Sequence, residues 1–310
     1  MLIFIYLFLG IVLLYYGAEW LIKGACSIAL NLRISQLIIG LTVVAFGTSA
    51  PELVVSLKAS VSAYGDIAIG NVIGSNIANI CLILGIASII SPIKIQKQIL
   101  NFDLLFCIII SIVLWIFIFF DAFLGRLEGI FLVGIFLIYI FLLWKKSLKE
   151  ENLIQIPEEL SNIRSSNLVS FFLVFLGIIS LVGGGYFFVE GAVKLARLMK
   201  ISEAVIGLTI VAIGTSLPEL AASVVAAIKK KDDISVGNIV GSNIFNICLI
   251  LGLSSIISPI KVKDIGGSDF FFMLFSVIIL YPIMLTGNII SRREGGFLLL
   301  VYVVYIIFLF

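Results

Sequence analysis

One stretch of the chain occurs twice, and this duplication constrains the fold more than any other feature. Aligned at a constant shift of 167, residues 40–95 and 207–262 are identical at 35 of 56 positions. The run from Asn79 to Gly85 returns unchanged from Asn246 to Gly252. Weaker matches extend toward both ends of each half, so we interpret the chain as a tandem duplication of one structural unit.

The composition indicates where this unit folds. Hydrophobic residues make up 62% of the 310 positions and charged residues 12%, with a mean hydropathy of +1.27. Soluble domains have about a quarter of their residues charged. Apolar spans long enough to cross a bilayer lie near 3–25, 34–62, 67–91, 100–120, 125–144, 168–190, 201–228, 234–258, 268–287 and 293–310. The sequence therefore predicts an all-α polytopic membrane protein with ten transmembrane helices.

The duplication divides these spans into two sets of five. We expect a first repeat over 1–144, a polar linker over 145–167 and a second repeat over 168–310. Because five is odd, the second repeat enters the membrane from the opposite side, which makes the repeats inverted. Alternating loops place 13 lysines and arginines on one side and 7 on the other. The excess predicts a cytoplasmic linker and both termini outside the cell membrane.

Several classes of function are excluded by residues that are absent. The chain has no histidine, and its four cysteines show no C-x-x-C spacing. A zinc site, a disulfide framework and a Ser-His hydrolase are therefore not indicated. The net charge of +2 is spread thinly, so nucleic acid is not expected as a partner. We therefore expect neither an enzyme nor a cofactor. We infer no protein partner, and we expect a lipid bilayer to surround the chain.

Each repeat carries the polar motif Gly-Thr-Ser-x-Pro-Glu, at Gly47–Glu52 and Gly214–Glu219. The proline has no N–H for the carbonyl four residues earlier and its ring crowds that carbonyl, so the helix should break or bend. Freed carbonyls are tolerated at membrane depth where they line a polar cavity, and a carboxylate there is expensive unless it is functional. The motif predicts a hard-cation site that contains Glu52 and Glu219.

A second polar stripe follows on the next span of each repeat. Its residues are four apart and share a helix face: Asn71, Ser75 and Asn79, with Asn238, Ser242 and Asn246. Such residues either contact an ion or join helices by hydrogen bonds. Both interpretations remain open for the amides Asn71, Asn76, Asn238 and Asn243.

These motifs resemble the two α-repeats of the calcium/cation antiporters, and of their sodium/calcium exchanger branch in particular. The resemblance rests on the Gly-Thr-Ser-x-Pro-Glu pair and on the Gly-Asn-x-x-Gly-Ser-Asn pair at 70–76 and 237–243. It implies that Glu52 and Glu219 bind calcium together with backbone oxygens of Thr48 and Thr215. It also implies sodium ligands at Ala45, Thr48, Ser49, Ser75, Ala212, Thr215, Ser216 and Ser242, with both glutamates shared and Asn79 and Asn246 at a central polar site.

The resemblance and the charges together imply a secondary active antiporter that exchanges sodium for calcium by alternating access. Two carboxylates neutralise one Ca²⁺, and two Na⁺ neutralise them equally. A third Na⁺ would leave the site with one net charge, so we expect electrogenic exchange. Asn79 and Asn246 carry no charge that could balance K⁺, so we expect potassium independence. A calcium/proton antiporter is the main alternative because glutamates can also carry protons. A channel would differ by showing no counter-ion dependence.

Overall fold

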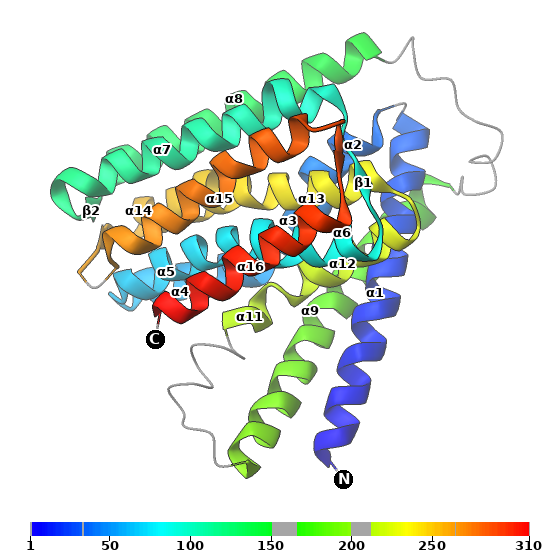
Figure 1. Ribbon diagram of the computed structural model, residues 1–310, viewed down its shortest axis with the longest axis horizontal. Coiled ribbons are helices and arrows are strands. Elements are labelled where there is room, and N and C mark those ends of the chain that lie inside the picture. Colours follow the sequence, from blue (N-terminus) through cyan, green and yellow to red (C-terminus); the bar gives the residue numbers. More distant parts are fainter. Residues whose placement is uncertain (1, 33, 151–165, 200–211, 264, 310) are drawn as a thin grey trace.

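The computed structural model describes residues 2–32, 34–150, 166–199, 212–263 and 265–309, and within them the protein is almost entirely helical (Figure 1). The elements before residue 151 are α1 (Leu2–Leu32), α2 (Gln36–Ile39), η1 (Gly40–Val44), α3 (Ala45–Thr48), α4 (Ala50–Val61), α5 (Gly65–Ile77), η2 (Ala78–Leu84), α6 (Gly85–Ile90), β1 (Ile93–Lys94), η3 (Ile99–Asp103), α7 (Leu104–Asp121), β2 (Phe123–Leu124) and α8 (Arg126–Glu150). The elements after residue 165 are α9 (Asn167–Leu198), α11 (Ala212–Thr215), α12 (Leu217–Ile228), α13 (Asp232–Phe245), η6 (Asn246–Leu251), α14 (Gly252–Ile257), β3 (Ile260–Lys261), α15 (Gly267–Leu285), β4 (Ile289–Ile290) and α16 (Arg292–Leu309).

The described helices are those of a polytopic membrane protein. Seven of them are long and apolar enough to span a membrane, and an eighth span is formed if the bent pair Gln36–Thr48 and Ala50–Val61 counts as one. The expected count of ten crossings stays a prediction, because part of the expected span 201–228 lies outside the described residues. Helix α8 continues past its expected end at residue 144 to Glu150, so the polar segment begins within a helix.

Two continuous helices form the centre of the molecule. The span Gly65–Ile90 is 72% buried and the span Asp232–Ile257 is 83% buried, whereas the other five spans are 22–44% buried. Each is a pair of α-helical segments joined by a π-helical stretch, η2 or η6. Such π-helical stretches are frequent at functional sites, and here both begin within one residue of the amides Asn79 and Asn246.

Short strands connect the two halves of the chain. Strand β1 pairs antiparallel with β4 through Ile93 and Ile290. Strand β2 pairs in the same way with β3 through Leu124 and Ile260. Because each two-stranded sheet takes one strand from each half, the halves are joined by backbone hydrogen bonds as well as by helix packing.

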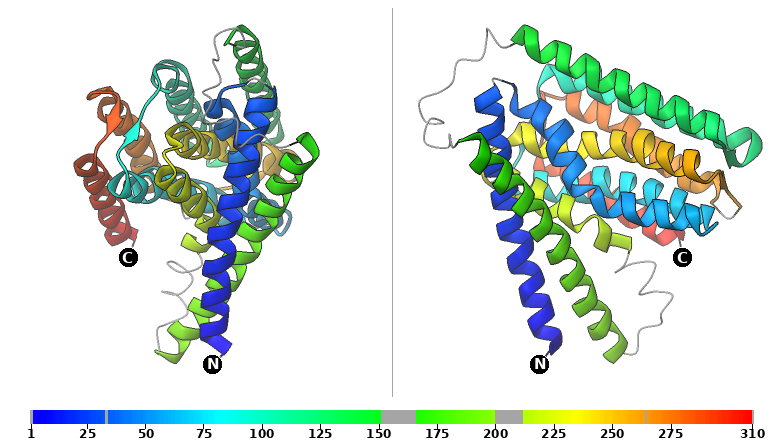
Figure 2. Two further views of the ribbon diagram at one scale, coloured as in Figure 1. Left: turned by 90° about the vertical axis from the view of Figure 1, so that its right-hand side faces the viewer. Right: turned by 180° about the vertical axis from the view of Figure 1, so that it is seen from behind.

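Helices α1 and α9 lie side by side and project beyond the remaining helices (Figures 1 and 2). They run antiparallel, since Gly10 lies against Phe188 and Gly24 against Ser170. Glycines recur along the contact at Gly10, Gly17, Gly24, Gly177, Gly184 and Gly191. An added Cβ at Gly177 would lie 2.6 Å from the backbone nitrogen of Leu21. The small residues therefore let the two backbones approach closely.

This contact predicts unequal effects for two alanine substitutions on α9. Gly177→Ala should destabilise the protein by about 1–3 kcal/mol, because the new methyl group meets backbone that has no room to move. Gly183→Ala should be neutral or slightly stabilising, since its Cβ would meet nothing within 4 Å and alanine favours a helix. Thermal unfolding of the two purified variants checks this, and equal melting temperatures would contradict the packing described.

Candidate cation-binding site

Each Gly-Thr-Ser-x-Pro-Glu motif is a break between two short helices. Ser49 joins α3 to α4 with φ −82° and ψ 9°, and Ser216 joins α11 to α12 with φ −88° and ψ 7°. The first break bends the chain by 50°. Pro51 and Pro218 stand at the start of the following helix, where a missing N–H is tolerated. The predicted break is confirmed at Pro51, and the matching angles place the same break at Pro218.

The serine at each break reaches across to the glutamate of the other repeat. Ser49 Oγ donates to Glu219 Oε1 at 2.8 Å, and Ser216 Oγ donates to Glu52 Oε1 at 3.3 Å. Both glutamate side chains are at most 1% exposed. The two halves therefore bring their carboxylates into one buried polar cluster.

Several buried oxygens in this region have no hydrogen-bond partner among the described residues: Glu52 Oε2, Glu219 Oε2, Ser242 Oγ, Asn79 Oδ1 and Asn246 Oδ1. An unpaired buried acceptor is costly, so each one calls for an explanation. All five belong to the two glutamates or to the two polar stripes. Na⁺ and Ca²⁺ are hard cations that bind oxygen ligands, so a cation bound among these atoms would explain them. Helix α4 packs against η6 and α12 against η2, so the carboxylates and the amides come from neighbouring elements.

Four asparagines fix the orientation of the two central amides. Asn79 Nδ2 donates to Asn243 Oδ1 at 2.9 Å, and Asn246 Nδ2 donates to Asn76 Oδ1 at 3.0 Å. Asn76 and Asn243 also donate to each other's backbone carbonyls, at 3.4 and 3.3 Å. With their nitrogens occupied, Asn79 and Asn246 keep their carbonyl oxygens available. For Asn76 and Asn243 the structure supports the interhelical hydrogen-bonding interpretation.

Another pair of amides holds the helices that carry the glutamates. Asn71 Nδ2 donates to Ser56 Oγ at 2.9 Å and to the Glu52 carbonyl at 3.3 Å. Asn238 Nδ2 donates to Ser223 Oγ at 2.9 Å and to the Glu219 carbonyl at 3.5 Å. The sequence reasoning missed Ser56 and Ser223, although each lies four residues after a glutamate on the same helix face.

The remaining predicted residues surround this cluster. Thr48 Oγ1 donates to Asn238 Oδ1 at 3.0 Å, and Ser75 Oγ accepts from Ser216 at 3.4 Å. Ala45 is fully buried next to the first break. Thr215 is half-buried and lines a cavity of about 410 Å³ between α4, α9 and α11. Only the backbone of Ala212 is described, as the first residue of α11.

The cluster provides two carboxylates and otherwise neutral oxygens. Among the described residues no group of three or more histidine, cysteine, aspartate or glutamate side chains gathers to hold a metal. The chain also matches the family model described as "Sodium/calcium exchanger protein" over residues 2–145 and 169–310. The chain belongs to the sodium/calcium exchanger family. Members of this family are antiporters, so this exchanger-family protein is a transporter and not an enzyme.

Individual relatives cover nearly the whole exchanger-family chain. It is 38% identical to the protein named "Putative antiporter CaxA" of Alkalimonas amylolytica, over 99% of this chain and 98% of CaxA. It is 36% identical to the sodium/calcium exchanger MaX1 of Methanosarcina acetivorans, over 99% and 98%. The solved structure of the sodium-calcium exchanger NCX_Mj soaked with zero Na⁺ and Ca²⁺ superposes with a TM-score of 0.86, at 33% identity, over 100% of this chain and 99% of that one.

Proposed function

We propose that this protein is a secondary active antiporter that exchanges sodium for calcium by alternating access. The observation that carries the proposal is the buried cluster in which Glu52 and Glu219 each accept a serine hydroxyl from the opposite repeat and each keep an unpaired oxygen. Calcium binds about six to eight oxygens, typically with carboxylates among them. Glu52, Glu219 and the backbone oxygens of Thr48 and Thr215 would form the calcium site.

Sodium would use the same glutamates together with neutral oxygens on both sides of them. We assign these ligands to residues of the two breaks and the two stripes: Ala45, Thr48, Ser49, Ser75, Ala212, Thr215, Ser216 and Ser242. The unpaired hydroxyl of Ser242 supports this assignment. Asn79 and Asn246 would supply the central amide oxygens. The ions displace one another because both species need the two carboxylates.

The charge of the site leads to an electrogenic exchange. One Ca²⁺ balances two carboxylates, and in a low-dielectric site a residual charge is costly. Two Na⁺ give the same balance, so any third sodium moves one net charge across the membrane. With Asn79 and Asn246 neutral, a K⁺ bound beside Ca²⁺ would be unbalanced, so we propose potassium-independent exchange.

The antiparallel contact of α1 with α9, which start their respective halves, supports inverted repeats. We propose ten transmembrane helices in two inverted repeats, 1–144 and 168–310, with the linker 145–167 in the cytoplasm and both termini outside the cell membrane. The strand pairs β1–β4 and β2–β3, each joining the two halves, support a two-fold relation. Inverted repeats meeting at a central site are a recurring design of transporters that work by alternating access.

A calcium/proton antiporter remains the second candidate. The observation in its favour is the burial of Glu52 and Glu219, since a buried carboxylate with an unpaired oxygen can bind a proton in place of a cation. A proton carried by a glutamate binds to one carboxylate oxygen and needs no serine or asparagine ligands, whereas Na⁺ needs several oxygen ligands. The three unpaired serine and asparagine oxygens, Ser242 Oγ, Asn79 Oδ1 and Asn246 Oδ1, therefore favour Na⁺ over H⁺ as the counter-ion.

Ser242→Ala tests the sodium ligands. This substitution should raise the sodium concentration that half-inhibits calcium binding by several-fold, because one neutral ligand is lost, and it should change calcium affinity less. Calcium-induced thermal stabilisation, titrated with sodium, provides the measurement. Ser254→Ala is the matched control, because Ser254 is a buried serine with an unpaired hydroxyl eight residues beyond Asn246. An unchanged sodium response in Ser242→Ala would remove Ser242 from the site.

A further inference from the structure

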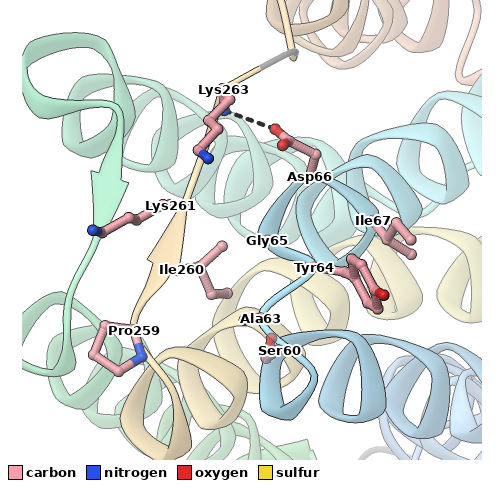
Figure 3. Close-up of a pocket in the computed structure, with 10 residues that line it drawn as sticks. All are labelled: Ser60, Ala63, Tyr64, Gly65, Asp66, Ile67, Pro259, Ile260, Lys261 and Lys263. Atoms are coloured by element: carbon pink, nitrogen blue, oxygen red, sulfur yellow. Dashed lines mark hydrogen bonds between the residues drawn. The ribbon is translucent and has the colours of Figure 1, made fainter.

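A cavity of about 660 Å³ lies where α4 ends, α5 begins and the loop that carries β3 crosses them (Figure 3). Its walls include Ser60 and Tyr64 on one side and Lys261 and Lys263 on the other. Ser60 lies eight residues after Glu52 on α4, which is about 12 Å along a helix. The cavity is therefore distinct from the cation cluster.

Two features of the walls point to a polar ligand. Ser60 is 3% exposed and its hydroxyl has no hydrogen-bond partner among the described residues. Figure 3 shows the side chain of Lys263 near the carboxylate of Asp66, and the side chain of Lys261 directed away from Ser60 and Tyr64, at the far edge of the cavity. Neither lysine forms an ion pair with a described acidic residue. The carboxylate of Asp66 accepts the backbone N–H of Lys263 at 2.8 Å.

At the corresponding junction of the other repeat, the polar side chains form hydrogen bonds with one another. Ala63 and Lys230 are equivalent and both are left-handed, with φ 60° and 57°. At the second junction Lys230 Nζ donates to Ser91 Oγ at 2.8 Å, and Gln96 Nε2 donates to Asp233 at 2.6 Å. The polar side chains of the second junction are therefore already hydrogen-bonded within the protein. The first junction has alanine in place of that lysine and keeps an open cavity, which is lined by two lysines and one aspartate, Asp66.

We propose that this cavity binds the phosphate headgroup of an anionic phospholipid. The Lys263 ammonium contacts the phosphate, Lys261 adds positive charge at the edge, and the Ser60 hydroxyl donates to a phosphate or glycerol oxygen. Tyr64 and Ile67, which are 62% and 54% exposed, contact the glycerol and the first acyl carbons.

A lipid fits this position better than a free anion does. The cavity lies at the ends of membrane-spanning helices, next to an exposed tyrosine and an exposed isoleucine. Tyrosine is enriched at the headgroup level of a bilayer, where lysines attract anionic lipids. A site for free phosphate would have no use for the exposed apolar side chains beside it. This proposal does not depend on which ions the protein exchanges.

The test is thermal unfolding of the purified full-length protein in detergent, titrated with dioleoyl phosphatidylglycerol, dioleoyl phosphatidylcholine or inorganic phosphate. Phosphatidylglycerol should stabilise the wild type at lower concentrations than either other additive. In the double variant Lys261→Gln/Lys263→Gln the half-saturating concentration should rise roughly thirtyfold, from two lysine–anion contacts. In Ser60→Ala it should rise several-fold.

Lys94→Gln/Lys97→Gln is the matched control, because it removes the same charge at the corresponding loop of the other repeat. It should respond to phosphatidylglycerol like the wild type. An equal loss in this control would show a general charge effect and overturn the site. Equal stabilisation by phosphatidylcholine or by inorganic phosphate would overturn the assignment to an anionic lipid. Melting temperatures measured without lipid separate loss of binding from loss of folding.

Discussion

Glu52→Gln and Glu219→Gln should each reduce sodium-driven calcium uptake to the level of protein-free vesicles. Each carboxylate supplies half of the negative charge that faces Ca²⁺. Removing one member of a buried charge pair costs about 3–5 kcal/mol, which corresponds to a loss in calcium affinity of at least roughly a hundredfold. Uptake of radioactive calcium into proteoliposomes measures the effect, and calcium-induced thermal stabilisation shows whether binding or movement is lost.

Glu128→Gln is the matched control for these two substitutions. Glu128 lies in the first turn of α8, and the change removes the same charge without altering the cluster. Uptake by Glu128→Gln should equal that of the wild type. Near-normal uptake in Glu52→Gln or Glu219→Gln would show that the buried pair is not the calcium site.

Asn246→Asp should make calcium uptake depend on potassium or on pH. The wild-type amide donates to Asn76 Oδ1 at 3.0 Å and leaves its own Oδ1 unpaired. Aspartate would add a third negative charge to the cluster, and that charge needs either K⁺ or a proton as a partner. Replacing potassium with choline at clamped potential should leave wild-type uptake unchanged and lower that of the variant several-fold, or shift its pH profile.

Asn246→Leu separates the charge from the geometry. This variant loses the hydrogen bond and the oxygen without gaining a charge, so it should transport less calcium but show no new dependence on potassium or pH. If wild-type uptake falls sharply in choline, the proposed potassium independence is wrong. If Asn246→Leu acquires the same potassium dependence as Asn246→Asp, the third charge is not its cause.

The repeated motif made the centre of the protein predictable. Pro51 lacks an N–H wherever it stands in a helix, so the break before Glu52 follows from local chemistry alone. The duplication then predicted that a second copy of the same polar segment meets the first. The crosswise donation from Ser49 to Glu219 was not predicted, because it depends on how far the two broken helices are offset when they pack.

Pairs of residues that are distant in the chain could not be predicted from local spacing. Glu19 and Lys23 are four residues apart, a spacing that favours an ion pair on a helix, but the Glu19 carboxylate binds Lys229 at the end of α12. Asp103 stands at the start of α7, where a carboxylate is favourable, and it is also fully buried and accepts from Tyr139 at 2.9 Å. In both cases helix packing brings together two residues that are far apart in the sequence, so their contact cannot be predicted from local spacing. The same spacing does give a local ion pair between Glu190 and Lys194, at 2.9 Å.

Calcium uptake into proteoliposomes with separately imposed sodium and pH gradients tests the central claim most directly. Vesicles loaded with sodium and diluted into sodium-free medium that contains calcium should accumulate calcium. A membrane potential negative inside the vesicle should slow this uptake, because each Na⁺ that leaves beyond the two that balance one Ca²⁺ would remove one positive charge. Sodium-free vesicles with a pH gradient alone should accumulate none. Uptake that follows the pH gradient without sodium would contradict sodium/calcium exchange and establish the calcium/proton antiporter in its place.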